Sequence, residues 1–323
     1  MTDSRIVYSK LLRTQVESHR VTESWKTADI RGLAEENDQI CSSGKYVVRG
    51  KTDTEYPMVV PPPARLSIVP CAMVARTAKF ALSELCVASC DALSAALALT
   101  ALQLEDGDTS EPAILSFANA DIPGGRYRSG GRAQEEDLCR LLPPLYATLA
   151  AAPSPSGDTT VMHPTAATTS TGAYPIPAGT TLFSSRLPVV RRPGTYALCP
   201  PQTFVSVITA AMPCGLADKR PAGGWLSESS LWGQTVTTRI RSVLHTAAEN
   251  GSTHIVLGAF GCGAFGNPPG PTARIFRQQL LSPEFRGQFR RVVFAIIDPV
   301  GTGNLKPFAT ELEQCDAAST FGA

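Results

Sequence analysis

Several residue types and patterns that define other protein classes are scarce in this sequence. Only 4 histidines occur among 323 residues, and none joins a cysteine cluster at the spacing of a zinc site, so we expect no metal. No apolar run approaches the roughly 18 residues that a membrane-spanning helix needs. Basic and acidic residues nearly balance, 29 against 28, and leave a formal net charge of +1. Such a chain has no general positive field to attract nucleic acid.

The 9 cysteines are scattered along the chain and form no dense framework. An odd number in this arrangement is typical of a reducing compartment, where disulfides are rare. The amino-terminal segment is mixed and charged and lacks the apolar core of a signal peptide. We therefore expect a soluble protein of the cytoplasm or the nucleus, neither secreted nor bound to a membrane.

The length of 323 residues and the hydrophobic fraction of 43% suit either one large domain or a domain with an elaboration. Strands separated by helices imply an α/β fold, a mixed sheet sandwiched between helices. We expect strands at residues 65–71, 113–117, 203–208, 255–257 and 292–298. We expect helices at residues 82–104, 134–142, 229–250 and 271–280.

Shifts in composition predict the domain boundaries. Residues 1–63 should form a helical N-terminal extension and a connector that ends in three prolines. Residues 64–310 should form the main domain, and residues 311–323 a tail. A stretch rich in Ala, Ser, Thr and Pro at about 150–181 carries little charge, which predicts a solvated loop or a disordered insertion.

The most informative stretch runs from residue 113 to residue 140. A buried strand ends at the polar Asn119, a glycine-rich loop follows at residues 123–131, and Glu135 and Glu136 then enter a helix. Glycine tolerates positive φ and lets backbone amides approach a ligand, so this loop is suited to wrapping a sugar or a phosphate. Adjacent residues on a helix point about 100° apart. The two glutamates should therefore have different roles, one as a proton donor and one in gripping the substrate.

A carboxylate at the start of a helix is favoured in its charged form. General acid catalysis at neutral pH therefore needs an environment that raises the pKa, such as partial burial beside an anionic ligand. Taken alone, paired glutamates in a first helical turn are more often surface residues, and a glycine-rich loop is most often only a loop. Their succession within so few residues favours a site for an anionic, phosphorylated sugar.

Three motifs carry a resemblance to a known family: Phe117-Ala118-Asn119-Ala120, Pro123-Gly124-Gly125 and Ala133-Gln134-Glu135-Glu136-Asp137-Leu138-Cys139-Arg140. Together they resemble the signature of the microbial-type poly(ADP-ribose) glycohydrolases, which are macrodomain enzymes. In that family the loop normally reads Gly-Gly-Gly, and Gln-Glu-Glu follows after a short spacer. Arg126 stands in place of the third glycine, where it can reshape the pocket, pair with a phosphate or shift the accepted substrate.

A second strand followed by glycines, at residues 255–267, resembles the second phosphate loop of the family. Small residues before a helix N-terminus can hold a pyrophosphate through amide donors and the helix dipole. The alternative is a tight connection without a ligand, but two such turns in one chain weaken it. The resemblance implies that Phe265 packs on the distal ribose. It also implies that the pyrophosphate meets the backbone around Gly261, Cys262, Gly263 and Ala264.

The resemblance implies a macrodomain that hydrolyses the ribose–ribose O-glycosidic bonds of poly(ADP-ribose) and releases ADP-ribose. Glu136 would protonate the leaving oxygen, Glu135 would fix the flanking ribose, and water would be the nucleophile. Further substrate contacts would come from Asn119, Gly124, Gly125, Arg126 and Gln134. We expect no cofactor, and a monomer that acts on ADP-ribose polymer or on ADP-ribosylated proteins.

Two alternatives to this function stay open. One is a hydrolase of single ADP-ribose modifications on protein or nucleic acid, suggested by Arg126. The other is a module that binds ADP-ribose without cleaving it, against which the intact Gln134-Glu135-Glu136 argues.

Overall fold

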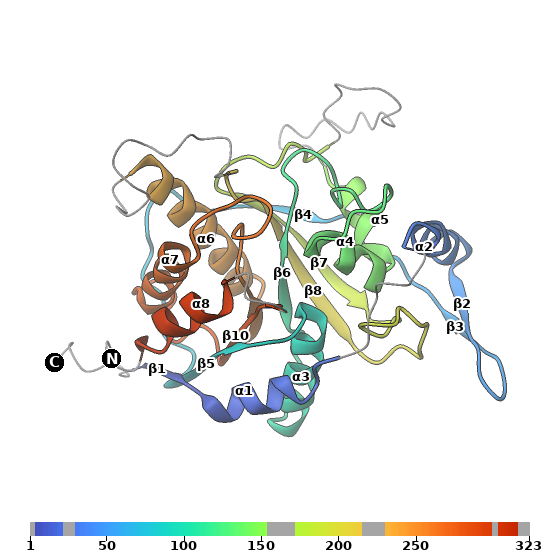
Figure 1. Cartoon of the computed structure of the whole chain (residues 1–323), viewed down its shortest axis with the longest axis horizontal. Coiled ribbons are helices and arrows are strands. Elements are labelled where there is room, and N and C mark those ends of the chain that lie inside the picture. The colour runs from blue at the N-terminus through green and yellow to red at the C-terminus, as the bar shows by residue number, and fades with distance from the viewer. Residues whose placement is uncertain (1–3, 22–29, 154–171, 215–229, 299–302, 316–323) are drawn as a thin grey trace.

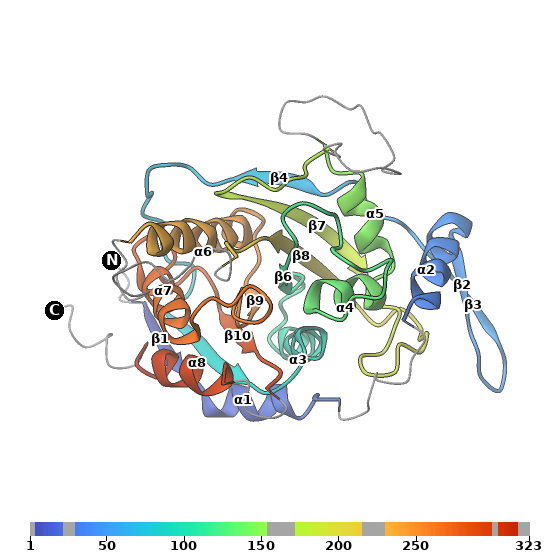
Figure 2. The same cartoon turned by 45° about the horizontal axis from the view of Figure 1, so that its top comes forward.

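The computed structural model describes residues 4–21, 30–153, 172–214, 230–298 and 303–315. One sheet of 8 strands organises them, in the order β1-β5-β10-β9-β6-β8-β7-β4 (Figures 1 and 2). The first six strands in this order are parallel, and β7 and β4 are antiparallel to their neighbours. In sheet order the bounds are β1 (Arg5–Tyr8), β5 (Leu82–Ala88), β10 (Arg291–Ala295), β9 (His254–Leu257), β6 (Ala113–Phe117), β8 (Phe204–Ala210), β7 (Thr180–Pro188) and β4 (Arg65–Ile68). The predicted α/β class with a mixed sheet is confirmed.

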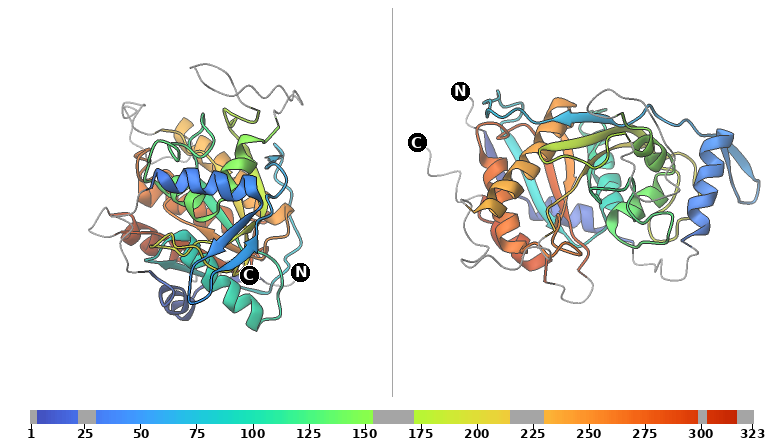
Figure 3. Two further views of the ribbon diagram at one scale, coloured as in Figure 1. Left: turned by 90° about the vertical axis from the view of Figure 1, so that its right-hand side faces the viewer. Right: turned by 90° about the horizontal axis from the view of Figure 1, so that it is seen from above.

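Helices cover both faces of this sheet (Figure 3). One face packs against α1 (Lys10–Glu17), α3 (Ala92–Glu105), α4 (Gln134–Leu141) and α5 (Pro144–Ala150). The other face packs against α6 (Leu231–Glu249), α7 (Pro269–Leu281) and α8 (Leu305–Leu312). Successive side chains of a strand point to opposite faces, so Ile114 of β6 belongs to the first core and Leu115 to the second. The central strands are therefore apolar on both sides.

A smaller unit projects from one side of the sandwich (Figures 1 and 3). It consists of α2 (Gly32–Ser43) and an antiparallel hairpin of β2 (Lys45–Val48) and β3 (Thr54–Pro57). Its own core is formed by Ile40, Tyr46 and Met58, which pack against Val190. The residues predicted as a plain connector therefore include a strand.

The predicted helix over residues 82–104 is wrong in its first part. Residues 82–88 form strand β5, and the helix α3 begins only at Ala92, where the Asp91 side chain accepts the amide of Ser94. A strand that is buried on both faces reads as a continuous apolar run, and periodicity cannot separate such a run from a buried helix. Cys86 and Cys90 lie in the core at 0% and 2% exposure.

The structure also differs from the predicted boundaries. Strand β1 pairs with β5 and α1 packs on the same sheet, so residues 5–17 are built into the main domain rather than into an extension. At the other end α8 crosses the predicted limit at residue 310 and packs on α7. Within the predicted insertion, residues 154–171 lie outside the described ranges. Ala173, Tyr174 and Ile176 are buried in the core, so the end of that stretch is not a solvated loop.

Candidate active site

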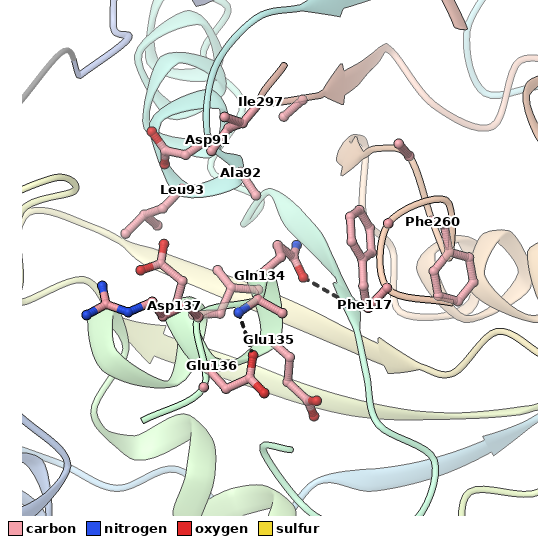
Figure 4. Close-up of a pocket in the computed structure, with 18 of the residues that line it drawn as sticks. Asp91, Ala92, Leu93, Phe117, Gln134, Glu135, Glu136, Asp137, Phe260 and Ile297 are labelled. Atoms are coloured by element: carbon pink, nitrogen blue, oxygen red, sulfur yellow. Dashed lines mark hydrogen bonds between the residues drawn. The ribbon is translucent and has the colours of Figure 1, made fainter. Parts of the chain in front are cut away.

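A cavity of about 640 Å³ opens where the carboxyl ends of β5, β6, β9 and β10 meet. Ligands of open α/β sheets bind at this edge, and the volume is typical of a small-molecule site. Figure 4 shows that lining residues from all four strand ends and from the start of α4 come together around this space. The strand-to-helix connections predicted to bind ligand therefore meet in one place.

Gln134 fastens the start of α4 to strand β6. Beyond Ile114, β6 has no pairing with β9, and the amide of Gln134 takes the place of the missing strand. Its Nε2 donates to the carbonyl of Leu115 at 2.7 Å, and its Oε1 accepts the amide of Phe117 at 2.8 Å (Figure 4). Because both polar atoms serve the backbone, Gln134 positions the helix that carries the glutamates.

Glu135 is buried, with 2% of its surface exposed. The amide of Asn119 donates to its Oε2 at 2.7 Å, and the amide of Gly124 adds a second hydrogen bond. Within the described part of the chain, its buried Oε1 has no partner. Burial, reinforced by the charge of Glu136, raises the pKa of Glu135 to about 8 against the lowering effect of the amides. Glu135 is thus predominantly neutral at pH 7 without any bound anion.

Glu136 is nearly as buried, at 6% exposure, but its partners differ. The amide of Arg126 in the glycine-rich loop donates to its Oε1 at 2.9 Å. The amide of Ala133 donates to its Oε2 at 2.9 Å, so the side chain reaches back over the first turn of its own helix. Backbone amides of the loop and of the helix start therefore fix this carboxyl group.

Both carboxyl groups face the same glycine. A Cβ on Gly125 would lie 2.7 Å from Oε2 of Glu135 and 2.8 Å from Oε1 of Glu136. The expectation that the neighbouring glutamates point apart is therefore wrong for their tips, although the amides that bind them are separate. Gly125 also has φ of +55°, a conformation that other residues rarely adopt.

Asn119 forms the predicted polar elbow after β6. Its Oδ1 accepts the amides of Asp121 and Ile122 at 2.8 and 3.0 Å, which closes a turn. Among the described residues, nothing accepts a hydrogen bond from its Nδ2, and Asn119 lines the cavity. One donor of this side chain is thus available to a ligand.

The second glycine-rich loop follows β9 and is held by Asn267. The Nδ2 of Asn267 donates to the carbonyls of Gly261 and Pro213 at 3.0 and 2.9 Å, and its Oδ1 accepts from the indole of Trp232 at 2.8 Å. Gly261 has φ of +72°, and a Cβ there would lie 2.7 Å from Asn267 and Met212. The loop has one fixed shape that only glycine allows at this position.

The cavity brings together nine of the twelve residues predicted from the sequence. They are Asn119, Arg126, Gln134, Glu135, Glu136, Gly261, Gly263, Ala264 and Phe265. Gly124, Gly125 and Cys262 do not line it. Gly124 is packed against Tyr146 and Cys139, Gly125 lies beneath the glutamates, and the Cys262 thiol reaches the carbonyl of Phe260.

Several lining residues escaped the sequence analysis: Asp91, Phe117, Asp137, Tyr196, Phe260 and Ile297. Asp137 is the clearest case. Burial raises its pKa to about 6, and it accepts a hydrogen bond from the hydroxyl of Tyr196, which is 59 residues away. Local pattern carries no signal for such a contact. Asp137 directly follows the paired glutamates, and this was the one available hint.

Two absences hold for the described ranges. No cluster of His, Cys, Asp and Glu there could hold a metal ion. No helix there combines the length and the apolar character needed to cross a bilayer.

Comparison with known proteins gives this site a context. The family model for the catalytic domain of microbial-type PARG matches residues 34–192. The poly(ADP-ribose) glycohydrolase (PARG) of Thermomonospora curvata is similar, with a TM-score of 0.64, 26% identity, and coverage of 87% of this chain and 98% of that one. The PARG of Deinococcus radiodurans in complex with ADP-ribose is 31% identical over 71% of this chain and 84% of that one, with a TM-score of 0.53. No curated protein sequence matches.

The layered mixed sheet and the site at its carboxyl edge define a macrodomain-type hydrolase. More narrowly, the chain belongs to the microbial-type poly(ADP-ribose) glycohydrolase family.

Proposed function

We propose that this protein hydrolyses the ribose–ribose O-glycosidic bonds of poly(ADP-ribose) and releases ADP-ribose. The observation that carries the proposal is the placement of Glu135 and Glu136 over Gly125 by backbone amides at the edge of the cavity. The relatives support the ligand, since the D. radiodurans structure holds ADP-ribose and a T. curvata structure holds the inhibitor ADP-HPD.

Glu136 is our proton donor. As the bond to the leaving oxygen breaks, positive charge grows on the anomeric carbon and negative charge on that oxygen. Glu136 gives its proton to the oxygen, water attacks the carbon, and the proton lost by this water restores Glu136. The amides of Arg126 and Ala133 hold the carboxyl in place through both steps.

Glu135 holds the ribose beside the reacting bond. Its raised pKa of about 8 supports a neutral carboxyl at pH 7, which can both donate to and accept from ribose hydroxyls. A neutral Glu135 also adds no negative charge that would repel the phosphates of the substrate.

The remaining contacts belong to the two loops. The free Nδ2 of Asn119 donates to the distal ribose, and Phe265 packs on that sugar. Amides of the Gly261–Ala264 turn receive the pyrophosphate, whose negative charge also favours the cationic transition state. Gly124 and Gly125 contribute by shaping the first loop rather than by lining the cavity.

The test is release of ADP-ribose from poly(ADP-ribosyl)ated protein by the wild type, Glu136→Ala, Glu136→Gln and Glu135→Gln, with ADP-ribose affinity measured on each. We expect loss of release at similar affinity for both Glu136 variants. Glu135→Gln reproduces the neutral carboxyl, so it should keep a substantial part of the activity. If Glu135→Gln were inactive and Glu136→Gln active, the donor would be Glu135. Binding without release by the wild type would leave a module that only binds ADP-ribose.

A second candidate is the hydrolysis of single ADP-ribose modifications. Arg126 is the reason to test it, because this exposed residue beside Glu136 changes the wall of the cavity where the family has glycine and so bears on the choice of substrate. Comparing polymer with singly modified protein as substrates separates the two.

We further infer a monomeric enzyme of the cytoplasm or the nucleus. All nine cysteines are free thiols, which suits a reducing compartment.

A further inference from the structure

Arg126 combines a fixed backbone with a free side chain. Its amide donates to Glu136, and its carbonyl accepts the amides of Ser129 and Gly131 at 3.1 and 2.8 Å, which closes the loop on itself. The side chain is exposed and lines the cavity. Within the described ranges, no carboxylate, carbonyl or aromatic ring contacts its guanidinium.

The loop leaves room for this side chain. A Cβ on Gly131 would lie 2.7 Å from the Cβ of Arg126 and 2.8 Å from Oε1 of Glu136. Only glycine at residue 131 therefore allows an arginine at residue 126 and the carboxyl of Glu136 to lie side by side.

The charged residues around the cavity indicate a role for Arg126 in binding an anion. Four lining residues are acidic: Asp91, Glu135, Glu136 and Asp137. Of the lining arginines, Arg140 is buried and donates to the carbonyls of Ile30 and Gly131, and Arg132 has an interaction of its own. Arg126 is thus the lining cation, among described residues, whose donors are free. Guanidinium groups bind phosphate in a bidentate manner.

An ADP-ribose polymer offers two pyrophosphates near the reacting bond. The terminal unit has one, and the Gly261–Ala264 turn supplies amides for it. The leaving unit has another, and this unit begins at the oxygen that Glu136 protonates. The backbone amide of Arg126 donates a hydrogen bond to Glu136. The side chain of Arg126 therefore starts close to the oxygen that Glu136 protonates, which is where the leaving unit begins.

We propose that Arg126 binds the pyrophosphate of the leaving ADP-ribose unit and so makes the site selective for polymer over single ADP-ribose modifications. This inference rests on the proposed function. A single modification on a protein has no phosphate on the leaving side, so Arg126 gives it no advantage.

The experiment compares poly(ADP-ribose) with ADP-ribosyl-ribose, which has the same O-glycosidic bond but no phosphate in its leaving unit. Both are assayed with the wild type, Arg126→Ala and Arg126→Lys. Arg128→Ala is the matched control, because Arg128 is an exposed arginine of the same loop that is paired with Asp38. ADP-ribose affinity is measured for each protein.

We expect Arg126→Ala to lower kcat/KM for polymer about 10- to 100-fold, the loss typical of one hydrogen bond to a charged group. Its kcat/KM for ADP-ribosyl-ribose and its affinity for ADP-ribose should not change. Arg126→Lys should recover part of the loss, and Arg128→Ala should behave as the wild type.

Four results would overturn the inference. Equal losses on both substrates, or weaker binding of ADP-ribose, would place Arg126 on the pyrophosphate of the terminal unit. Faster polymer cleavage by Arg126→Ala or Arg126→Gly would mean that the arginine obstructs the polymer. A wild type that cleaves neither substrate would refute the proposed function and this inference with it, whereas an unchanged ratio between the substrates would refute the inference alone.

Discussion

Substituting Gly125 by alanine tests whether the loop backbone positions the glutamates. The new Cβ would lie 2.7 Å from Oε2 of Glu135 and 2.8 Å from Oε1 of Glu136, so both carboxyl groups must move. A displacement of about 1 Å in a catalytic group can reduce the rate about 100-fold. We therefore expect kcat on poly(ADP-ribose) to fall by about 10- to 100-fold.

The same substitution also strains the backbone, and this effect has to be separated. A residue other than glycine in the left-handed region costs about 1–2 kcal/mol. Gly107 has φ of +70° and no atom within 4 Å of its would-be Cβ. Gly107→Ala is thus a control that carries the strain without the collision.

The assay measures kcat and thermal unfolding for both variants. Gly107→Ala should lose about 1–2 kcal/mol of stability and Gly125→Ala at least as much, but only Gly125→Ala should lose activity. Wild-type kcat in Gly125→Ala would show that the glutamates do not act from the positions described. An equal loss of activity in Gly107→Ala would show that strain alone explains the effect.

Three further predictions concern the groups around this loop. The pKa of Glu135 is raised from 4.5 to about 8. The contribution of Glu135 to stability is therefore complete below a pH of about 4.5 and is lost as the pH rises through about 8. Charging this buried group costs on the order of 5 kcal/mol of folding free energy. The melting temperature of Glu135→Gln should rise relative to that of the wild type as the pH increases from 5 to 8, with the exposed Glu105→Gln measured beside it as a control; a constant difference between Glu135→Gln and the wild type would contradict the raised pKa. Gln134→Ala leaves two backbone groups of β6 without partners, so denaturant unfolding should show a loss of about 1–3 kcal/mol, and kcat should fall more than ADP-ribose affinity. Asn267→Ala releases the turn at Gly261, so calorimetry should show weaker ADP-ribose binding while the kcat of bound substrate changes less; unchanged affinity would remove that turn from the binding site.

The sequence predicted the elements of the fold better than their limits. The strand at 113–117 and its glycine loop were located correctly, because an apolar run that stops at a polar residue and glycines has few other structures. The sequence predicts a helix where strand β5 lies, because a strand buried on both faces has the continuous apolar run of a buried helix. Strand β1 pairs with a segment 77 residues further along the chain, Arg5 with Leu82, and nothing within four residues of sequence announces such a partner.

The residues of the site also divide into those that the sequence indicates and those that it does not. Glu135 and Glu136 could be found because they sit in one short motif, whereas Tyr196 reaches Asp137 only after the chain has folded. The raised pKa of Glu135 could not be predicted either, since it comes from burial under the loop and not from the helix start, which acts in the opposite direction.

The loop between β6 and α4 separates chemistry from substrate choice. The groups that hold the two glutamates are backbone amides, from Asn119 and Gly124 for Glu135 and from Arg126 and Ala133 for Glu136. A side-chain substitution cannot remove such a donor, but a change in loop shape displaces it. Exchanging Arg126 therefore alters what the cavity binds while its amide still holds the proton donor. Filling Gly125 instead leaves the charges of the cavity unchanged and moves both carboxyl groups. Substitution of Arg126 is thus the easiest way to change the substrate without moving the catalytic groups. Substitution of Gly125, the residue before it, is the most restricted.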